Sequence, residues 1–515
     1  MPKRFLRKDI LLAIGIGILT FLIYLPSLKS GFVYDAEYQI LNNDYIHTAS
    51  NFYDVISFRV LGSDVLDNNR PVQLFSLMLD SLFSGYQPFG YHLTNILLHS
   101  FNAVLLVILL TELLGGEQRY AIACGALVFA LHPVNVEVVA EVSSREDALT
   151  TFFVLSGLLL AIKFGSVCNR RKWLYAAASV LAFLLAVGAK ETGIVGPFLL
   201  CLYWLLYGSR ERKRDWVILI ASAFCMVQIF LYARFALPPV VSRVFLHSPT
   251  YLGGSFSHVF LYQPRIWAFL IKNIFWPFQL SADYVPQNVA WITLPAAIAT
   301  IVVFISAQIG IGWKNRTAFF GAAIFWLALA PVSNFIPIYR PLADRFLYLP
   351  MVGIALSVAT LLVVAKSRRL LYRSLIGVCI LSLCVLAALT WKREAAFENS
   401  LNLWNDTTVK SPFSVTAQAN LGYALIDSGD YQNAIAAFQK ALNLSKGTFP
   451  DAWLGGAIAL EKSGQYSGAE RSLQKAIELD RIYAQPQKLL EASIITRENA
   501  LTAEEINTRI SHKQP

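Results

Sequence analysis

The sequence is poor in charge. Only 15% of its 515 residues are charged, whereas 56% are hydrophobic and 13% are aromatic. A soluble globular protein of this length needs far more charge to cover its surface, so the composition excludes an ordinary soluble enzyme. A lipid bilayer is therefore the expected surroundings of most of the chain.

The sequence also lacks the cysteine spacing of a zinc site or a disulfide framework. Six cysteines are present, and no two of them form a CxxC motif. Five lie inside apolar runs and Cys168 lies in a basic loop. We therefore expect no disulfides, no metal site and no resident cofactor, with a divalent cation as the one alternative left open.

A continuous basic face is missing as well. The net charge of +10 comes from short Lys and Arg clusters between apolar runs. Cytoplasmic loops of membrane proteins carry such clusters, whereas a nucleic-acid site needs a connected basic surface. The sequence therefore predicts a bilayer partner and no nucleic-acid partner.

Apolar runs long enough to cross about 30 Å of hydrocarbon recur along residues 1–390. They number about eleven and lie near residues 10–28, 92–114, 119–140, 148–164, 173–189, 193–207, 215–236, 291–312, 317–337, 346–365 and 370–390. The segment Arg265–Leu280 has Lys272 near its centre and is expected to lie in the membrane interface. These runs predict an all-α, polytopic transmembrane helical bundle.

The basic clusters set the orientation of this bundle. With a cytoplasmic N-terminus, every strong cluster falls on the cytoplasmic side. The outer loops 29–91 and 237–290 then share the opposite side with the C-terminal tail. We expect a multi-pass protein of a bacterial inner membrane, with the endoplasmic reticulum membrane as the second choice.

Residues 391–515 are expected to form a separate, extracytoplasmic helical-repeat domain. One pattern of residues recurs there with a period of 35: Gly429, Tyr431, Ala434, Phe438 and Ala441 return as Gly464, Tyr466, Ala469, Leu473 and Ala476. Small residues at this spacing let two antiparallel helices approach closely, and the pattern resembles a tetratricopeptide repeat.

Two such repeats bury little surface, so helices near residues 392–409 and 486–497 are expected to cap them, with a last helix starting at Thr502. The resulting α-solenoid is expected to bind a protein or peptide. A packing or oligomerisation module is the alternative.

Two acids, Asp35 and Glu37, follow the first apolar run directly. A carboxylate at the membrane surface can act as a general base toward both a membrane-bound donor and an aqueous acceptor. Taken alone, such acids are ordinary solvated loop residues. Further polar residues on the same side of the membrane are needed to support catalysis.

Those residues are present at the outer ends of the apolar runs: Arg70, His92, His132, Glu137, Arg145, Lys190, Arg340 and Arg345. Ionisable groups at a membrane edge are costly, so several at one face indicate a polar site, in which cations could hold a lipid phosphate. Singly, each could be a helix-end anchor or half of an ion pair. The spacing of His92, Asn95 and His99 is typical of a hydrogen-bonded seam between helices.

In their order and spacing, these motifs resemble the transmembrane and tetratricopeptide-repeat-containing (TMTC-like) family, which is related to the protein O-mannosyltransferases of the GT-C superfamily. The resemblance covers nearly the whole chain. It is carried by Asp35 with Asn42-Asn43, Arg70-Pro71, Tyr91-His92-Leu93-Thr94-Asn95 through His99, His132-Pro133-Val134 with Glu137 and Arg145, Lys190-Glu191, and Asp344-Arg345-Phe346-Leu347-Tyr348-Leu349-Pro350.

The resemblance implies a GT-C-type fold, a polyprenyl-phosphate sugar as co-substrate, and inverting transfer to Ser or Thr of a protein. Carried over, Asp35 is the catalytic base, and Arg345 is the best candidate for the donor phosphate. Where the family commonly has a second acid, this sequence has Ala36. Glu37 could replace that acid, but on an extended segment it would point to the side opposite Ala36.

Three alternatives stay open. The acceptor could be a lipid or polysaccharide instead of a protein. The chain could be a multi-span transporter, which should show matching halves with broken helices. It could also be a non-catalytic membrane scaffold for the repeats, which would need fewer spans and no polar cluster at the outer face.

Overall fold

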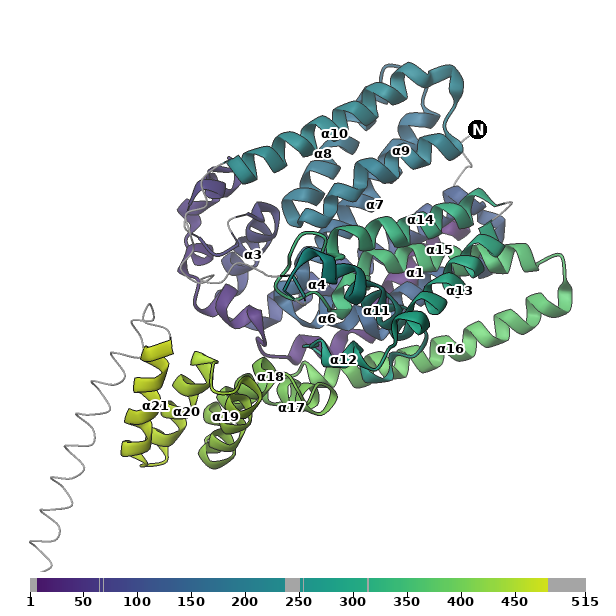
Figure 1. Ribbon diagram of the computed structural model, residues 1–515. Coiled ribbons are helices and arrows are strands. Elements are labelled where there is room, and N and C mark those ends of the chain that lie inside the picture. Colours follow the sequence, from purple (N-terminus) through teal and green to yellow (C-terminus); the bar gives the residue numbers. More distant parts are fainter. Residues whose placement is uncertain are drawn as a thin grey trace, which may run out of the picture. The chain divides into compact units, whose positions relative to one another are not determined.

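The computed structural model describes residues 7–63, 65–67, 69–236, 251–252, 254–312 and 315–479 (Figure 1). These residues form helices and contain no β-strand, so the predicted all-α class is confirmed. The helices fall into two units. The first comprises the described residues up to Leu280 together with Val289–Asn399, and the second comprises Ser281–Asn288 together with the described residues from Ser400 onward.

The first unit is a bundle of apolar helices. Seven helical segments among the described residues are long and apolar enough to cross a membrane. They correspond to α4 (Pro88–Leu114), α7 (Arg145–Ser166), α8 (Lys172–Ala189), α10 (Lys213–Ala236), α13 (Leu294–Gly312), α15 (Tyr348–Ala365) and α16 (Arg369–Ala396). The chain is therefore a multi-pass membrane protein.

The other predicted spans are also helical, but they are shorter or broken. They are α1 (Arg7–Ile23), α5 (Arg119–Leu131) with α6 (Val136–Ala140), α9 (Val195–Tyr207) and α14 (Arg316–Leu329). The α5–α6 pair bends by 45°, where a proline at the start of the next turn interrupts the hydrogen-bond ladder. Seven described segments are long and apolar enough to cross a membrane, or eight if the bent pair counts as one span. The number of eleven spans therefore stays a prediction. The expected interfacial segment, Arg265–Leu280, covers the second half of α11 (Phe256–Phe275) and the turn after it, and α11 is not among the seven.

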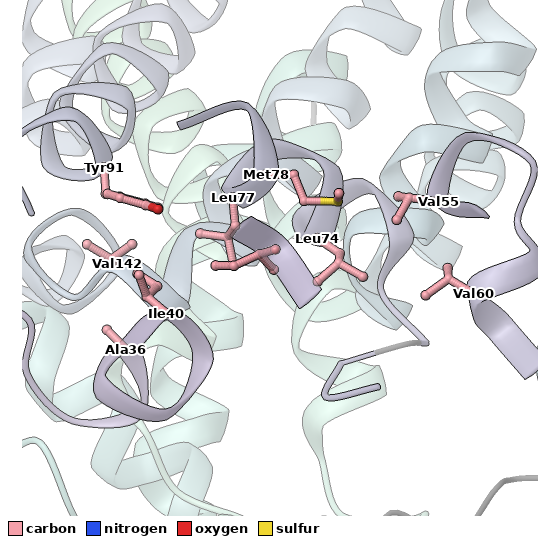
Figure 2. Close-up of a cluster of buried hydrophobic side chains, with 10 residues drawn as sticks. Ala36, Ile40, Val55, Val60, Leu74, Leu77, Met78, Tyr91 and Val142 are labelled. Carbon is pink, nitrogen blue, oxygen red and sulfur yellow. The ribbon is translucent and has the colours of Figure 1, made fainter. Parts of the chain in front are cut away.

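The described residues between α1 and α4, predicted to be the first outer loop, have their own apolar core. They include α2 (Phe52–Ile56) and α3 (Pro71–Ser84). Figure 2 shows the core running from Ala36 and Ile40 through Leu77 to Val55. Burial of these side chains holds the segment around residue 35 against α3 and α4. The backbone at Asp35 is therefore held in place by the packing of its neighbours.

The second unit contains two helical pairs, and the predicted 35-residue repeat is confirmed. Its helices are α17 (Ser400–Lys410), α18 (Val415–Asp427), α19 (Tyr431–Ser445), α20 (Pro450–Lys462) and α21 (Tyr466–Leu479). Gly429 and Gly464 occupy equivalent turns with φ of 82° and 80°, a left-handed conformation that favours glycine.

The packing of these pairs depends on small residues, as the sequence indicated. A Cβ atom added to Gly422 would lie 2.6 Å from the Phe438 ring, and one added to Gly455 would lie 2.3 Å from it. Only glycine admits the ring at these two places. The predicted N-terminal cap, residues 392–409, covers the end of α16 and most of α17, while the cap near residues 486–497 and the helix from Thr502 lie outside the described residues. α16 continues to Ala396, past the domain boundary expected at residue 390.

A short segment between α11 and α13 belongs to the repeat unit. Within Ser281–Asn288, the carboxylate of Asp283 accepts a hydrogen bond from the Ser414 hydroxyl, which also caps α18 by accepting from the Ala417 amide at 2.9 Å. The Asn288 side chain donates to the Lys410 carbonyl at 3.3 Å. This segment therefore supports the turn between α17 and α18.

Candidate active site

Tyr34 and Asp35 begin the outer segment after α1. Tyr34 is buried and takes a left-handed backbone conformation, with φ of 62°, which is uncommon for a bulky residue and which the surrounding packing must enforce. The next residue, Asp35, is exposed. The guanidinium carbon of Arg340 lies 4.8 Å from the centroid of the Tyr34 ring. The predicted base therefore stands at the surface, next in sequence to a tyrosine that contacts a cation.

The neighbouring positions correct one expectation. Residues 35–41 are helical, not extended, so Glu37 and Ala36 do not point to opposite sides. Successive side chains on a helix diverge by about 100°. Ala36 is fully buried in the apolar core of the outer loop, where an acid would lose its hydration. The position where the family commonly has a second acid is thus closed to charge in this chain.

Arg345 is held in place by Glu137. Its guanidinium forms an ion pair with the Glu137 carboxylate, and its backbone amide donates to the same carboxylate at 3.2 Å. Glu137 lies on α6, beyond the bend after α5, and Arg345 precedes α15. The Asp35 carboxylate interacts electrostatically with Arg345. The structure therefore brings together the predicted base, Glu137 and the predicted phosphate-binding arginine.

A second set of charges surrounds Arg70 and Lys190. The Lys190 ammonium lies 2.9 Å from the Glu146 carboxylate and 2.7 Å from that of Asp147. Arg70 forms an ion pair with Glu146 and lies 3.4 Å from Glu191. Both predicted cations are thus neutralised by acids at the start of α7 and in the turn before α9. Arg345 also interacts with Asp147, which links this network to the Asp35 region.

Asp67 adds an acid from the outer loop to the same network. It lies 3.8 Å from Arg70. Burial raises the pKa of Asp67 to about 6, partly offset by Arg70, and the negative charges of Glu146 and Asp35 raise this pKa further. Asp67 therefore changes charge near pH 6, and its charge interacts with that of Asp35.

Arg145 is a predicted site residue whose partners all lie inside the fold. Its side chain is fully buried and donates to the Asn95 side chain at 2.6 Å and to the Tyr91 carbonyl at 2.7 Å. It also lies 2.5 Å from the Asp80 carboxylate. Arg145 therefore joins the start of α7 to α3 and α4.

The two predicted histidines also face the protein interior. His132 donates through Nε2 to the Ile274 carbonyl at 2.9 Å and accepts at Nδ1 from the Val134 amide, which stabilises the bend between α5 and α6. His92 is buried and its Nε2 contacts the Gly31 carbonyl at 3.2 Å. Gly31 lies directly before the outer segment, so His92 holds the start of that segment against α4.

The predicted seam along α4 is confirmed. The Asn95 side chain donates to the Val139 carbonyl at 3.2 Å, and His99 contacts the Tyr348 hydroxyl at 2.7 Å. His99 also contacts the Ala130 carbonyl at 3.1 Å. These bonds tie α4 to α5, α6 and α15 and position the helices that carry the charged residues.

Sequence reasoning missed four acids at or beside this site: Asp67, Glu141, Glu146 and Asp147. Glu146 and Asp147 had a usable signal, because two acids at the start of an apolar run are costly in a membrane. Glu141 caps the next turn by accepting from the Ser144 amide at 2.7 Å. Asp67 had no such signal in its polar loop.

The fold and site define a class, a multi-pass membrane protein with a tetratricopeptide-repeat unit. Comparison with known proteins supports this assignment. A tetratricopeptide repeat family matches residues 425–492. Protein O-mannosyl-transferase F38B6.6 of Caenorhabditis elegans is 26% identical over 85% of this chain and 63% of its own length. Protein O-mannosyl-transferase TMTC3 of Homo sapiens is 22% identical over 85% of this chain and 51% of its own length.

A third relative, Protein O-mannosyl-transferase Tmtc2 of Drosophila melanogaster, is 28% identical over 58% of this chain and 33% of its own length. The chain thus spans from 33% to 63% of the length of these relatives. The resemblance to the transmembrane and tetratricopeptide-repeat-containing family, drawn above from individual motifs, is confirmed.

Proposed function

We propose that this chain is a GT-C-type membrane glycosyltransferase, which transfers a sugar from a polyprenyl-phosphate donor to a hydroxyl group of an extracytoplasmic protein. The observation that carries the proposal is the exposed carboxylate of Asp35, which interacts electrostatically with the guanidinium of Arg345 that Glu137 holds in place. The names of the relatives support a protein acceptor and favour mannose as the sugar.

The two groups supply what an inverting transfer needs. The acceptor oxygen forms a bond to the anomeric carbon while the bond from that carbon to the lipid phosphate breaks. Asp35 takes the hydroxyl proton, because an alcohol attacks poorly until its proton is removed. The phosphate leaves with an added negative charge, and attack from the opposite face inverts the anomeric centre.

Arg345 is the residue proposed to hold that phosphate. One of its amino groups pairs with Glu137, and a guanidinium has five N–H donors, so further donors can serve a phosphate. A fixed cation at this place stabilises the charge that develops on the leaving group. Arg340, beside Tyr34, is the second candidate for the same phosphate. Lys190 and Arg70, paired with acids, are proposed to contribute to the electrostatic potential at the site rather than to bind the phosphate.

The repeat unit is proposed to recruit the protein acceptor on the non-cytoplasmic side. Stacked helical pairs present a surface suited to peptides. Labelling of a Ser463→Cys variant by an impermeant maleimide in intact cells or spheroplasts tests the side, since Ser463 lies in the turn after α20. Labelling only after lysis would contradict the proposed topology. We place the protein in a bacterial inner membrane, with the endoplasmic reticulum as the second choice.

Mass spectrometry of glycans on extracytoplasmic proteins, with and without this chain, tests the function. Loss of hexose from Ser and Thr upon deletion, restored by the wild type and not by Asp35→Asn, supports protein transfer. Loss of sugar only from lipids or polysaccharide would move the acceptor to those classes. Unchanged glycans, with substrate flux lost instead, would favour a transporter, and no chemical change at all would favour a scaffold.

A further inference from the structure

Two cysteines that are far apart in the sequence lie side by side in the first unit. Cys124 belongs to α5 and Cys379 to α16, and these helices pack together. Their thiols interact with each other. Cys124 belongs to an apolar cluster with Ala121 and Leu362, and Cys379 packs against that cluster. The sequence offered no hint of this pair, because 255 positions separate the two cysteines and no local pattern relates them.

We propose that Cys124 and Cys379 form a dithiol site that a membrane-permeant, two-electron thiol oxidant converts into an interhelical disulfide. The two S–H bonds break and one S–S bond forms. The oxidant accepts two electrons and two protons. With an azo oxidant such as diamide, the N=N bond takes up both hydrogens and becomes a hydrazine.

The surroundings of the pair define the class of oxidant. The side chains packed around it include Val358, Leu375 and Ile376, which are apolar and offer no charge to stabilise a thiolate. Thiols in such places react slowly with polar reagents, because the thiolate is the nucleophile. A neutral oxidant that dissolves in the bilayer reaches the pair, whereas a charged one does not.

The position on α16 gives the bond a structural consequence. Only 11% of the most apolar stretch of α16 is buried, the lowest share among the seven spans. Few side-chain contacts therefore hold this helix against the bundle. A covalent bond to α5 would prevent separation of α16, the helix that ends at Ala396 just before the repeat unit begins.

The test uses the purified full chain, first reduced and then treated with diamide or with iodine. After alkylation and digestion, mass spectrometry should find the Cys124 and Cys379 peptides joined, with the loss of two hydrogen atoms, and their free forms depleted. Cys379→Ser should abolish this linkage. Cys384→Ser, an exposed position on the same helix, should keep it.

A second probe separates proximity from oxidation. Phenylarsine oxide bridges two neighbouring thiols without an oxidant, so it should protect Cys124 and Cys379 from later alkylation while the exposed Cys168 stays reactive. Joined peptides and arsenical protection together support the site. Absence of both in a chain whose Cys168 reacts would overturn the proposal, as would equal linkage through another cysteine.

Discussion

The carboxylate of Glu137 accepts from both the guanidinium and the backbone amide of Arg345, although 208 positions separate the two residues. This double contact ties the start of α15 to the bent α5–α6 segment. It restricts the rotation of the guanidinium, which interacts electrostatically with Asp35. The pair therefore connects the fold of the bundle to the proposed chemistry, and the first three predictions depend on it.

Replacing Asp35 by Asn should lower turnover about 10²–10⁴-fold, because the amide keeps the size of the side chain and removes the proton acceptor. Donor binding and protein level should stay near wild type, since Asp35 is exposed. The measurement is kcat with a lipid-linked sugar and an acceptor peptide. Glu37→Gln is the matched control. If Glu37→Gln abolishes activity and Asp35→Asn does not, Glu37 is the catalytic base.

Replacing Arg345 by Ala should raise the KM for the donor about 10–100-fold, the cost of one charge-assisted contact to phosphate. Arg345→Lys should recover only part of this loss, because an ammonium lacks the bidentate fork. Donor titrations with each purified variant provide the comparison. Full rescue by lysine would mean that only charge matters at this position.

Glu137→Gln should weaken donor binding about tenfold while leaving the chain folded, since the amide can still accept from the Arg345 backbone. Glu137 acts here as a positioning residue through Arg345. A matched control is Glu112→Gln. It removes the 3.3 Å ion pair between Glu112 on α4 and Lys163 on α7, away from the proposed site. Equal effects of the two variants on KM would reduce the role of Glu137 to general stability.

Asp67 provides a pH prediction. Because its folded pKa is raised to about 6, the folded protein holds this proton more tightly than the unfolded chain does. The contribution of Asp67 to stability is therefore present below its ordinary pKa and is lost as pH rises to about 6. Asp67→Asn should stabilise the protein by up to about 2 kcal/mol above pH 6. This advantage should disappear near pH 4 in thermal unfolding, and a constant difference at every pH would refute the titration.

The segment Ser281–Asn288 yields a prediction for the repeat unit. Asp283→Ala removes the acceptor of the Ser414 hydroxyl, which caps α18, and should destabilise this unit by about 1–3 kcal/mol. Hydrogen exchange of α18 amides in the full chain reports the change. Glu478→Ala, which breaks an exposed pair with Lys475, should have almost no effect. Unchanged exchange in Asp283→Ala would show that α18 needs no support from this segment.

Local patterns made the spans and repeats predictable. An apolar run of sufficient length, or a Gly-x-Tyr pattern returning after 35 positions, determines a helix or a helical pair from neighbouring residues alone. The contact between Phe438 and Gly422 is local in the same sense, because both residues belong to one helical pair of the repeat. The segment around Glu37 was expected to be extended, but it is helical, because its conformation depends on burial of Ala36 and Ile40 against α3, which no local pattern records.

The sequence by itself determined the membrane class, the repeat unit and the set of polar residues from which a site could be built. Only the tertiary structure decided how that set divides. Arg145 and Arg345 look alike as arginines in polar turns, yet Arg145 is enclosed by Asn95 and Asp80, while Arg345 interacts electrostatically with the exposed Asp35. The physical reason is that a charged side chain is structural or functional according to its partners, and those partners arrive on helices distant in the sequence.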